Sequence, residues 1–327
     1  MRGARRSVCV IAAAAAALAL PGAVFAQQDA YPSKPVRIVV GFPAGSSTDV
    51  ATRVIAQRLG QALGQQFVVE NRAGASSNIA ARAVAGAQAD GYTLFVGTIA
   101  NTINATLQAN TSVDISKELL PVAMMGSVPN ILVAHPSLGV DNLAQLIAKA
   151  KADPGKITFA SSGNGTSPHL SGELLAFMAG VRMLHVPYKG SSPAVVDLLA
   201  GQVLTMFGPA STVLPHIREG KLKALASTGL TRASSMPDLP TVDELGLKGF
   251  ETSVWFGINA PLNTPAPVIE KLAAAVNAAQ DSAELQAQFK TQGIEVVRAG
   301  PSNYAALIRS ETDKWARVIK AAGVQSQ

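Results

Sequence analysis

The chain has 327 residues, of which 15% are charged, and a formal net charge of +6. This length suggests two domains, each able to bury an ordinary core. Lysine and arginine do not cluster into a basic patch, so the composition does not indicate a nucleic-acid surface. Cys9 is the one cysteine in the sequence, which excludes a disulfide framework and a cysteine metal site.

The N-terminus has the pattern of a secretory leader. A basic head is followed by an apolar run at 8–20 and by small residues at the usual cleavage positions, Val24 and Ala26. A run this short does not span a membrane, which takes about 20 residues. The sequence therefore predicts a signal peptide at 1–26, cleaved near Ala26, and a mature protein in a bacterial periplasm. Cleavage would also remove Cys9 and three arginines, lowering the formal net charge to +3.

Short apolar runs alternate with helical patterns along the mature chain. Strands are expected at 36–40, 67–69, 93–96 and 122–125, with helices at 50–63 and 79–87. A second series has strands at 131–134, 157–160, 183–186, 203–207 and 222–227, and helices at 143–152, 170–179, 194–200 and 214–219. The last third is expected to be helical at 268–281, 283–292 and 304–322, with a short strand at 295–297.

Strands that alternate with helices are typical of mainly parallel sheets covered by helices on both faces. The sequence therefore predicts an α/β fold. Joints at 127–130 and 249–261 would let the chain cross twice between two lobes, a geometry that commonly closes on a small ligand. The expected division is 27–128 plus 252–327 for lobe 1 and 129–251 for lobe 2.

Three loops that connect an expected strand to an expected helix are rich in glycine and hydroxyl residues. They occupy 41–49, 161–169 and 188–193. Ligands bind outside the carboxyl ends of strands in open α/β sheets, and the first N–H groups of a helix attract anions. Three such loops favour a shared anion pocket, although Ser, Thr and Asp are also ordinary helix N-caps. Asp49 is expected to be a cap, because a free carboxylate would repel an anion.

Nucleotide-binding and catalytic motifs are missing from these loops. Ser46 and Ser47 stand where a Walker A loop starting at Gly41 needs glycine and lysine. Pro168 stands where the dinucleotide pattern beginning at Gly163 needs its third glycine. The sequence also has no nucleophile elbow, zinc motif or calcium loop, so neither a cofactor nor a metal is expected.

A few charged or titratable side chains lie in or near these loops. His169 could donate a hydrogen bond to a carboxylate, or could simply be satisfied near a helix start. His185 is expected to be structural because it lies in a predicted strand. Lys189 could add positive charge to the pocket, or could be a solvated turn residue.

Seven stretches follow one another across the mature chain: YPSKPVRIVVGFPAG from Tyr31, VENRAG from Val69, ADGYTL from Ala89, HVPYKG from His185, LLAGQ from Leu198, LPHIREGKLKALA from Leu214 and PTVDELG from Pro240. Together they resemble the Bug-type periplasmic solute receptors of tripartite tricarboxylate transporters. The resemblance implies a two-lobed clamshell, like a periplasmic binding protein, that closes on a small carboxylate held in part through ordered water. It also implies delivery to a membrane permease with a large and a small subunit, and a monomeric receptor without enzymatic activity or cofactor.

The ligand-binding residues carried over by this resemblance lie in four loops. They are Phe42, Ala44, Gly45, Ser46, Ser47, Asp49, Thr98, Asn101, Ser162, Gly163, Asn164, Gly165, Thr166, His169, Tyr188, Lys189 and Gly190.

Two positions depart from the family pattern. Ser46 stands where the first loop often has a second glycine, and Gly208 stands where many members have an acidic residue. Without that acid the expected ligand is a mono- or dicarboxylate, aromatic acids included, rather than an amino acid. Two other interpretations stay open: a receptor that presents its ligand to a membrane sensor kinase, and a secreted serine hydrolase using Ser46 or Ser162.

Overall fold

The computed structural model describes residues 31–110 and 112–324. The predicted signal peptide at 1–26, with Cys9, lies outside these residues. The described chain is an α/β structure whose nine strands follow the order β2-β1-β3-β9-β4-β7-β5-β6, with β8 paired to β4. This confirms the predicted α/β class.

Sheet region 1 is built on β1 (Val36–Val40), which pairs in parallel with β2 (Phe67–Asn71) and β3 (Thr93–Thr98). It continues antiparallel through β9 (Ser253–Pro261) to the first part of β4 (Leu119–Ala134). Sheet region 2 has β5 (Thr158–Ser161) parallel to β6 (Leu184–Pro187) and β7 (Thr205–Pro209), while β7 and β8 (Lys223–Ser227) pair antiparallel with the end of β4. The parallel pairs therefore lie within each region, and the crossing strands add antiparallel ones.

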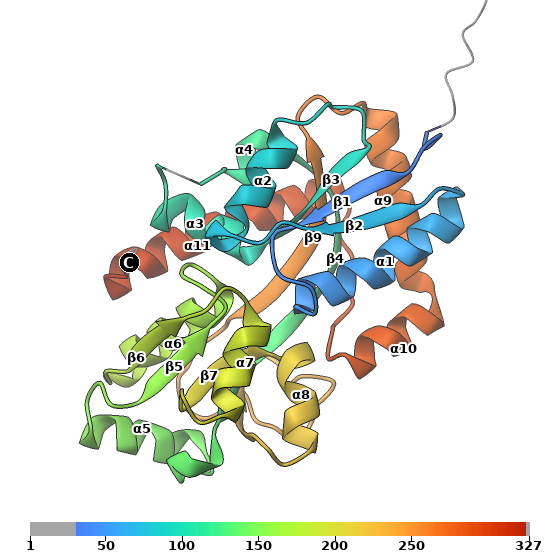
Figure 1. Cartoon of the computed structure of the whole chain (residues 1–327). Coiled ribbons are helices and arrows are strands. Elements are labelled where there is room, and N and C mark those ends of the chain that lie inside the picture. Colours follow the sequence, from blue (N-terminus) through green and yellow to red (C-terminus); the bar gives the residue numbers. More distant parts are fainter. Residues whose placement is uncertain (1–30, 111, 325–327) are drawn as a thin grey trace, which may run out of the picture. The chain divides into compact units, whose positions relative to one another are not determined.

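Helices cover both faces of sheet region 1 (Figure 1). Because alternate residues of a strand point to opposite faces, Ile38 packs with α1 (Ser47–Leu63) and α9 (Ala266–Asp281). Its neighbour Val39 belongs to a separate core with α2 (Asn78–Ala85), α3 (Ile99–Leu107) and α11 (Pro301–Ala322). The short helices α4 (Ile115–Glu118) and α10 (Ala283–Thr291) and the 3₁₀ turn η1 (Ala75–Ser77) complete this part.

The β4 part of sheet region 2 is also buried on both faces. Leu132 packs with α5 (Leu143–Ala152) and α6 (Ser167–Ala179), and its neighbour Val133 packs with α7 (Ser191–Leu199) and α8 (Ala210–Arg218). A second 3₁₀ turn, η2 (Pro136–Leu138), follows β4. Strands buried on both faces carry continuous apolar runs, which is why periodicity located most of them.

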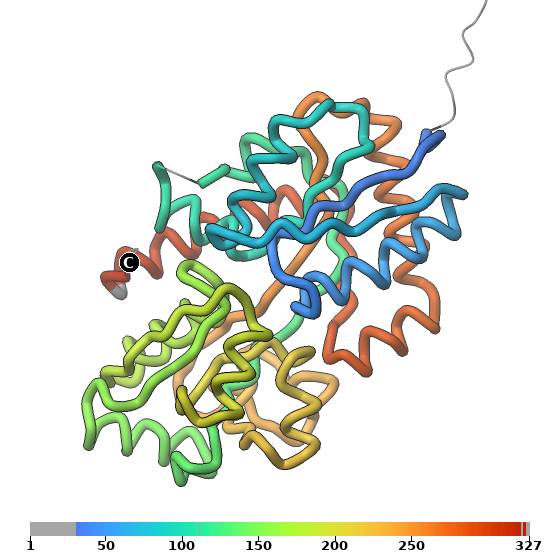
Figure 2. The backbone as a smooth tube through the Cα atoms, viewed as in Figure 1, coloured from blue at the N-terminus to red at the C-terminus, as the bar shows by residue number. Residues whose placement is uncertain are grey.

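Strand β4 links the two regions (Figure 2). Residues 119–129 pair with β9, and residues 130–134 pair with β7. The segments 122–125 and 131–134 are both strand, as predicted, but one continuous strand runs through both, so the predicted break between them was wrong. Pro121 and Pro129 suggested breaks, but the strand accommodates its irregular positions with register shifts near Pro121 and Met124. The predicted lobe boundaries at 128/129 and 251/252 stay a prediction.

The prediction missed some elements at the joints and misplaced another. Strand β9 falls within the segment 249–261, which was predicted to be a connection. The strand expected at 295–297 is wrong, since Glu295 makes only an isolated bridge to Ser127. Helix α3 was not foreseen either, although it directly follows β3. Within the described ranges, no helix is both long and apolar enough to cross a membrane.

Candidate ligand-binding site

The N-terminal ends of five helices meet at one small cavity. It is lined by Ser46 and Ser47 at α1, Thr98, Ile99 and Ala100 at α3, Thr166, Ser167 and Pro168 at α6, Ser191 at α7 and Pro209 before α8, together with Phe42, Ser162 and Val254. The first N–H groups of each helix have no partner inside the helix, and each helix end is partly positive. Hydroxyl groups line the same cavity and add adjustable donors. The site therefore suits the oxygen atoms of an anion.

This inner cavity has a volume of about 20 Å³, which is room for about one water molecule. Phe42 and Ser162 also line a larger outer cavity of about 460 Å³. An acid could therefore place its head group at the junction of the two cavities, with a water filling the inner one and the rest of the molecule in the outer one.

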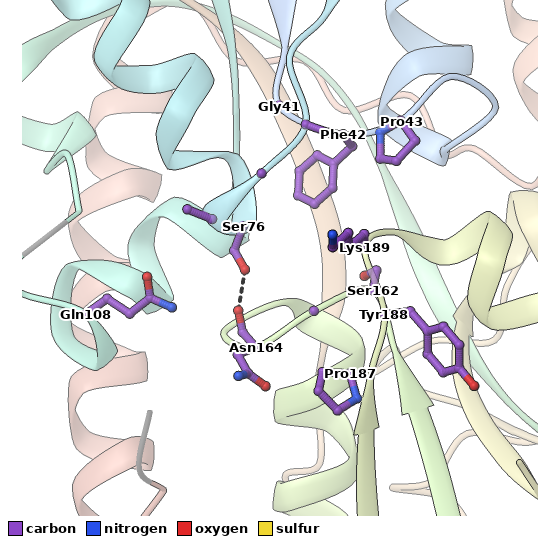
Figure 3. A pocket seen from close by; sticks show the side chains of 14 residues that line it. Gly41, Phe42, Pro43, Ser76, Gln108, Ser162, Asn164, Pro187, Tyr188 and Lys189 are labelled. Atoms are coloured by element: carbon purple, nitrogen blue, oxygen red, sulfur yellow. Dashed lines mark hydrogen bonds between the residues drawn. The ribbon is translucent and has the colours of Figure 1, made fainter. Parts of the chain in front are cut away.

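The outer cavity has walls from both sheet regions. Figure 3 shows Phe42, Pro43 and Ser76 from sheet region 1, with Pro187 and Tyr188 from sheet region 2. Rings and prolines make much of this wall apolar. Gly41, 73–75, Gln108, 162–164 and Lys189 complete the lining. This combination fits the apolar middle of a ligand.

Lys189 is the one lysine or arginine that lines either of these two cavities in the described part of the chain. Its side chain is exposed, so its ammonium group stays hydrated. A second negative group on a ligand would meet this ammonium at the outer cavity.

The start of α1 is fixed by Asp49, which does not line either cavity. Ser46 is the N-cap, accepting the Asp49 N–H at 3.3 Å, so the prediction that Asp49 is the cap was wrong. The Asp49 carboxylate instead accepts from the Gly45 N–H at 2.9 Å and from Arg53 and Asn71. Burial raises the pKa of Asp49, but these donors outweigh it and hold that pKa below its ordinary value. The carboxylate is thus neutralised locally and does not face the anion site.

The segment after β2 contributes a strained stretch of backbone. Ala75, Ser76 and Ser77 have φ values of 44°, 49° and 80°, a left-handed region that costs a non-glycine residue about 1–2 kcal/mol. Ser76 Oγ donates to the carbonyl oxygen of Asn164, bridging the two walls of the outer cavity (Figure 3). Strain held by a contact of this kind is typical of ligand sites.

The structure brings many of the predicted site residues together. Those that line one or both cavities are Phe42, Ser46, Ser47, Thr98, Ser162, Gly163, Asn164, Thr166, Tyr188 and Lys189. Those that line neither cavity are Ala44, Gly45, Asp49, Asn101, Gly165, His169 and Gly190. Asn101 accepts the Thr98 N–H in a capping box, and Gly190 packs so closely on Pro43 that a Cβ would lie 2.8 Å from its ring. The role of each residue in binding stays a prediction.

Sequence reasoning missed the loop at 73–76 and Gln108 as lining residues, whereas Ser191 lies in the candidate loop 188–193 although it was not named singly. The loop had a detectable signal, because AGASSN lies between a predicted strand and a predicted helix and has the same small, polar composition. Gln108 had none, since it lies at the end of a helix that was not predicted.

His169 and His185 lie beneath the 161–166 loop as a stacked pair, with ring centroids 4.1 Å apart. His169 is 3% exposed. Burial and the neighbouring His185 lower the pKa of His169 to about 3, and burial lowers the pKa of His185 to about 4. Both rings are therefore uncharged at neutral pH, so His169 does not offer a positive charge to an anion.

These pKa shifts predict acid sensitivity. The unfolded chain binds a proton at each histidine near pH 6.5, whereas the folded chain does not until about pH 3–4. Their contribution to stability is thus complete above pH 6.5 and is lost on acidification. Between pH 6.5 and 5, the free energy of unfolding should fall more steeply in wild type than in His169→Asn, by up to about 1.4 kcal/mol per pH unit. Urea unfolding at several pH values measures this difference, and equal slopes would contradict it.

One serine–histidine contact has the spacing of a catalytic nucleophile and its base. Ser161 Oγ and His185 Nε2 are 2.6 Å apart, which is the spacing of a serine and its base. However, Ser161 is fully buried and lines neither cavity. His185 Nδ1 has no hydrogen-bond partner in the described chain, so no carboxylate orients the ring as in a triad. The geometry favours a structural contact over catalysis.

A side chain larger than that of Gly208 does not fit at this position without rearrangement. Gly208 is buried on β7, and a Cβ there would lie 2.3 Å from Val213 Cγ1. No acid that could pair with a ligand amine stands at this position. Among the described residues, no group of three or more His, Cys, Asp and Glu side chains could hold a metal ion.

Fold and site together define a two-lobed α/β solute-binding protein of the periplasmic type. Residues 51–324 match the model of the tripartite tricarboxylate transporter family receptor. Protein BugT of Bordetella pertussis is 40% identical over 299 residues, covering 91% of this chain and 92% of BugT. The chain belongs to this receptor family.

Two solved structures share the fold along their whole length. The periplasmic binding protein BugD is 36% identical, with a TM-score of 0.86 over 91% of this chain and 100% of BugD. The R. palustris protein Rpa4515, solved with adipate, is 35% identical, with a TM-score of 0.87 over 90% of this chain and 99% of that one. These likenesses agree with the family that the sequence motifs indicated.

Proposed function

We propose that this protein captures a small organic acid carrying at least one carboxylate and hands it to a tripartite tricarboxylate-type membrane transporter. The observation that carries the proposal is the convergence of five helix N-terminal ends on one hydroxyl-lined cavity. Charge-assisted hydrogen bonds from such groups are worth roughly 1.5–3 kcal/mol each. A few of them, with burial of the ligand body, supply the roughly −8 kcal/mol of a micromolar dissociation constant. The protein acts by binding, without a chemical step.

Dicarboxylates are the favoured class of ligand. The head carboxylate would meet Ser46, Ser47 and Thr166 near the inner cavity, and an apolar middle would lie against Phe42 and the outer wall. A second carboxylate would then meet Lys189. Adipate, the acid in the structure of the similar R. palustris protein, has this plan of two charged ends and an apolar middle.

A thermal-shift screen of organic acids tests the proposal. Ligands that bind only the folded state stabilise it by mass action, by about 2.7 kcal/mol at 100 times the dissociation constant, and so raise its melting temperature. Linear diacids from malate to suberate, aromatic acids and the matched diamides would be compared. At least one acid should stabilise the protein and its uncharged amide should not. Stabilisation by amides and acids alike, or by none of the acids, would contradict an anion site.

Lys189 offers a test of the second charge. Lys189→Met should weaken adipate binding about fivefold, because a solvated ion pair contributes about 1 kcal/mol at most. Hexanoate, which keeps the chain and lacks the second carboxylate, should bind both proteins equally. Lys156→Met is the matched control, since Lys156 is an exposed lysine outside both cavities. Isothermal titration calorimetry measures these differences in affinity. An equal loss of affinity for hexanoate would show that Lys189 does not interact with the second carboxylate.

Export and the identity of the partner belong to the same proposal. Family membership supports a periplasmic receptor that meets a large and a small permease subunit. Mass spectrometry of the secreted protein would show whether its first residue follows Ala26. Loss of uptake on deleting the permease would support transport, whereas loss of gene induction alone would support a sensor.

A further inference from the structure

The 161–166 loop belongs to the wall of the site on the side of sheet region 2. Two side chains on the side of sheet region 1 donate hydrogen bonds to it. Ser76 Oγ donates to the Asn164 carbonyl, and Asn104 Nδ2 donates to the Gly165 carbonyl at 3.3 Å. The loop also lines both cavities through Ser162. Its position therefore matters for the ligand and for the contact between the walls.

Two histidines on the side of sheet region 2 contact the same loop through hydrogen bonds. The Gly165 N–H donates to His169 Nδ1 at 3.1 Å. His185 Nε2 contacts Ser161 Oγ at 2.6 Å, and Ser161 in turn exchanges hydrogen bonds with the backbone of Gly163 at 3.1 and 3.2 Å. Both rings thus act on backbone groups of the loop, one directly and one through a serine.

The rings keep each other in place by stacking. The ring of His169 stacks on that of His185 with centroids 4.1 Å apart, and the ring of His185 also stacks with Phe159 of β5 at 4.9 Å. The titratable group that faces the pair from α6 is Glu173, whose carboxylate is 3.7 Å from His169 Nε2. Burial raises the pKa of Glu173. The contacts from β5 come from Phe159 and Ser161, neither of which carries a charge.

The hydrogen bonds fix the tautomer of each ring. His169 Nδ1 accepts from Gly165, so its proton must be on Nε2, on the side of Glu173. Ser161 donates its proton to the Gly163 carbonyl, so His185 donates to Ser161 through Nε2–H. His185 Nδ1 is then a bare nitrogen, which agrees with its being buried without a partner, since an unpartnered N–H there would be more costly.

We propose that His169 and His185 are positioning residues that hold the 161–166 loop in its binding conformation. His169 does so by accepting a hydrogen bond at Nδ1 and His185 by donating one from Nε2. Neither ring contacts the ligand. The neutral state of His169 is required, because a ring protonated on both nitrogens has no acceptor for the Gly165 N–H. The effect on ligand affinity rests on the proposed function, whereas the effect on the loop does not.

A pair of variants separates the acceptor from the bulk of the ring. His169→Asn places an amide oxygen near the position of Nδ1 and removes the stack, whereas His169→Phe keeps the stack and removes the acceptor. Hydrogen exchange of peptides covering 161–170, without ligand, should be at least about tenfold faster in His169→Phe and near wild type in His169→Asn. Equal exchange in wild type and His169→Phe, or equally fast exchange in both variants, would overturn the acceptor role.

Wild-type protein supplies a second measurement that needs no variant. In ¹⁵N NMR spectra at pH 7, both histidines should show a protonated Nε2 and an unprotonated Nδ1, and the opposite tautomer on either ring would overturn the assignment. Adipate binding then completes the test: the dissociation constant should rise at least about tenfold in His169→Phe and much less in His169→Asn. If wild type does not bind adipate or another screened acid, the proposed function fails, while exchange and NMR still decide the positioning role.

Discussion

Gly165→Ala should weaken binding of the acid found by screening at least about 100-fold, an effect of about 2.7 kcal/mol. A Cβ at this position would lie 2.2 Å from Asn104 Oδ1 and 2.8 Å from its Cγ. Asn104 cannot move aside easily, because it is fully buried and its amide donates to Ala100 at 2.7 Å as well as to Gly165. The two walls would therefore have to separate, and the ligand would lose the contacts that both walls supply.

A matched glycine controls for backbone strain. Gly165 has a φ of +71°, so an alanine there is also destabilised by its left-handed backbone conformation. Gly220 has the same φ of +71°, but nothing lies within 4 Å of its Cβ position. Gly220→Ala should therefore lower the melting temperature and leave the dissociation constant unchanged. Titration and thermal unfolding of both variants check this, and wild-type affinity in Gly165→Ala would mean that the observed approach of the walls is not needed for binding.

The contrast between these two glycines shows what the sequence can tell about the site. The three loops with glycine and hydroxyl residues could be found from composition, because anion sites at helix starts need small residues and donors. The sequence did not reveal that Gly165 meets Asn104, since that contact joins residues 61 positions apart on an element, α3, that was not predicted. Long-range packing of this kind has no local signal.

The same limit explains the errors in the fold. The run 131–134 is apolar throughout and buried on both faces, and 36–40 is apolar and buried except for the exposed Arg37; both were located correctly as strand. Strand β9 was missed because Gly249 before it and Pro261 at its end resembled loop residues, and because its pairing with β4 depends on a distant segment. His169 shows the corresponding limit in the site, since only the fold reveals that its ring faces the loop backbone and His185.

A buried glutamine supports the strand that joins the two regions. Gln280, at the end of α9, is fully buried, and its Nε2 donates to the carbonyl groups of Met124, Met125 and Val297 at 3.2, 2.8 and 3.0 Å. The register of β4 against β9 shifts between Met124 and Gly126, so Met125 has no partner in the ladder. The side chain thus satisfies a carbonyl that the irregular strand cannot pair.

Gln280→Leu should lower the free energy of unfolding by about 3 kcal/mol, because it removes an amide whose two N–H groups serve three carbonyl acceptors, and each unsatisfied buried group costs about 1–3 kcal/mol. Gln280→Glu should cost more at neutral pH, since a carboxylate would face three carbonyl oxygens, and should recover in part on acidification, when the protonated acid can donate one hydrogen bond. Gln286→Leu is the control: this exposed side chain donates a single bond to the Gln280 carbonyl, so its loss should cost less than about 1 kcal/mol. Urea unfolding with a constant m-value measures all three, and equal costs for Gln280→Leu and Gln286→Leu would show that the irregular part of β4 does not depend on this amide.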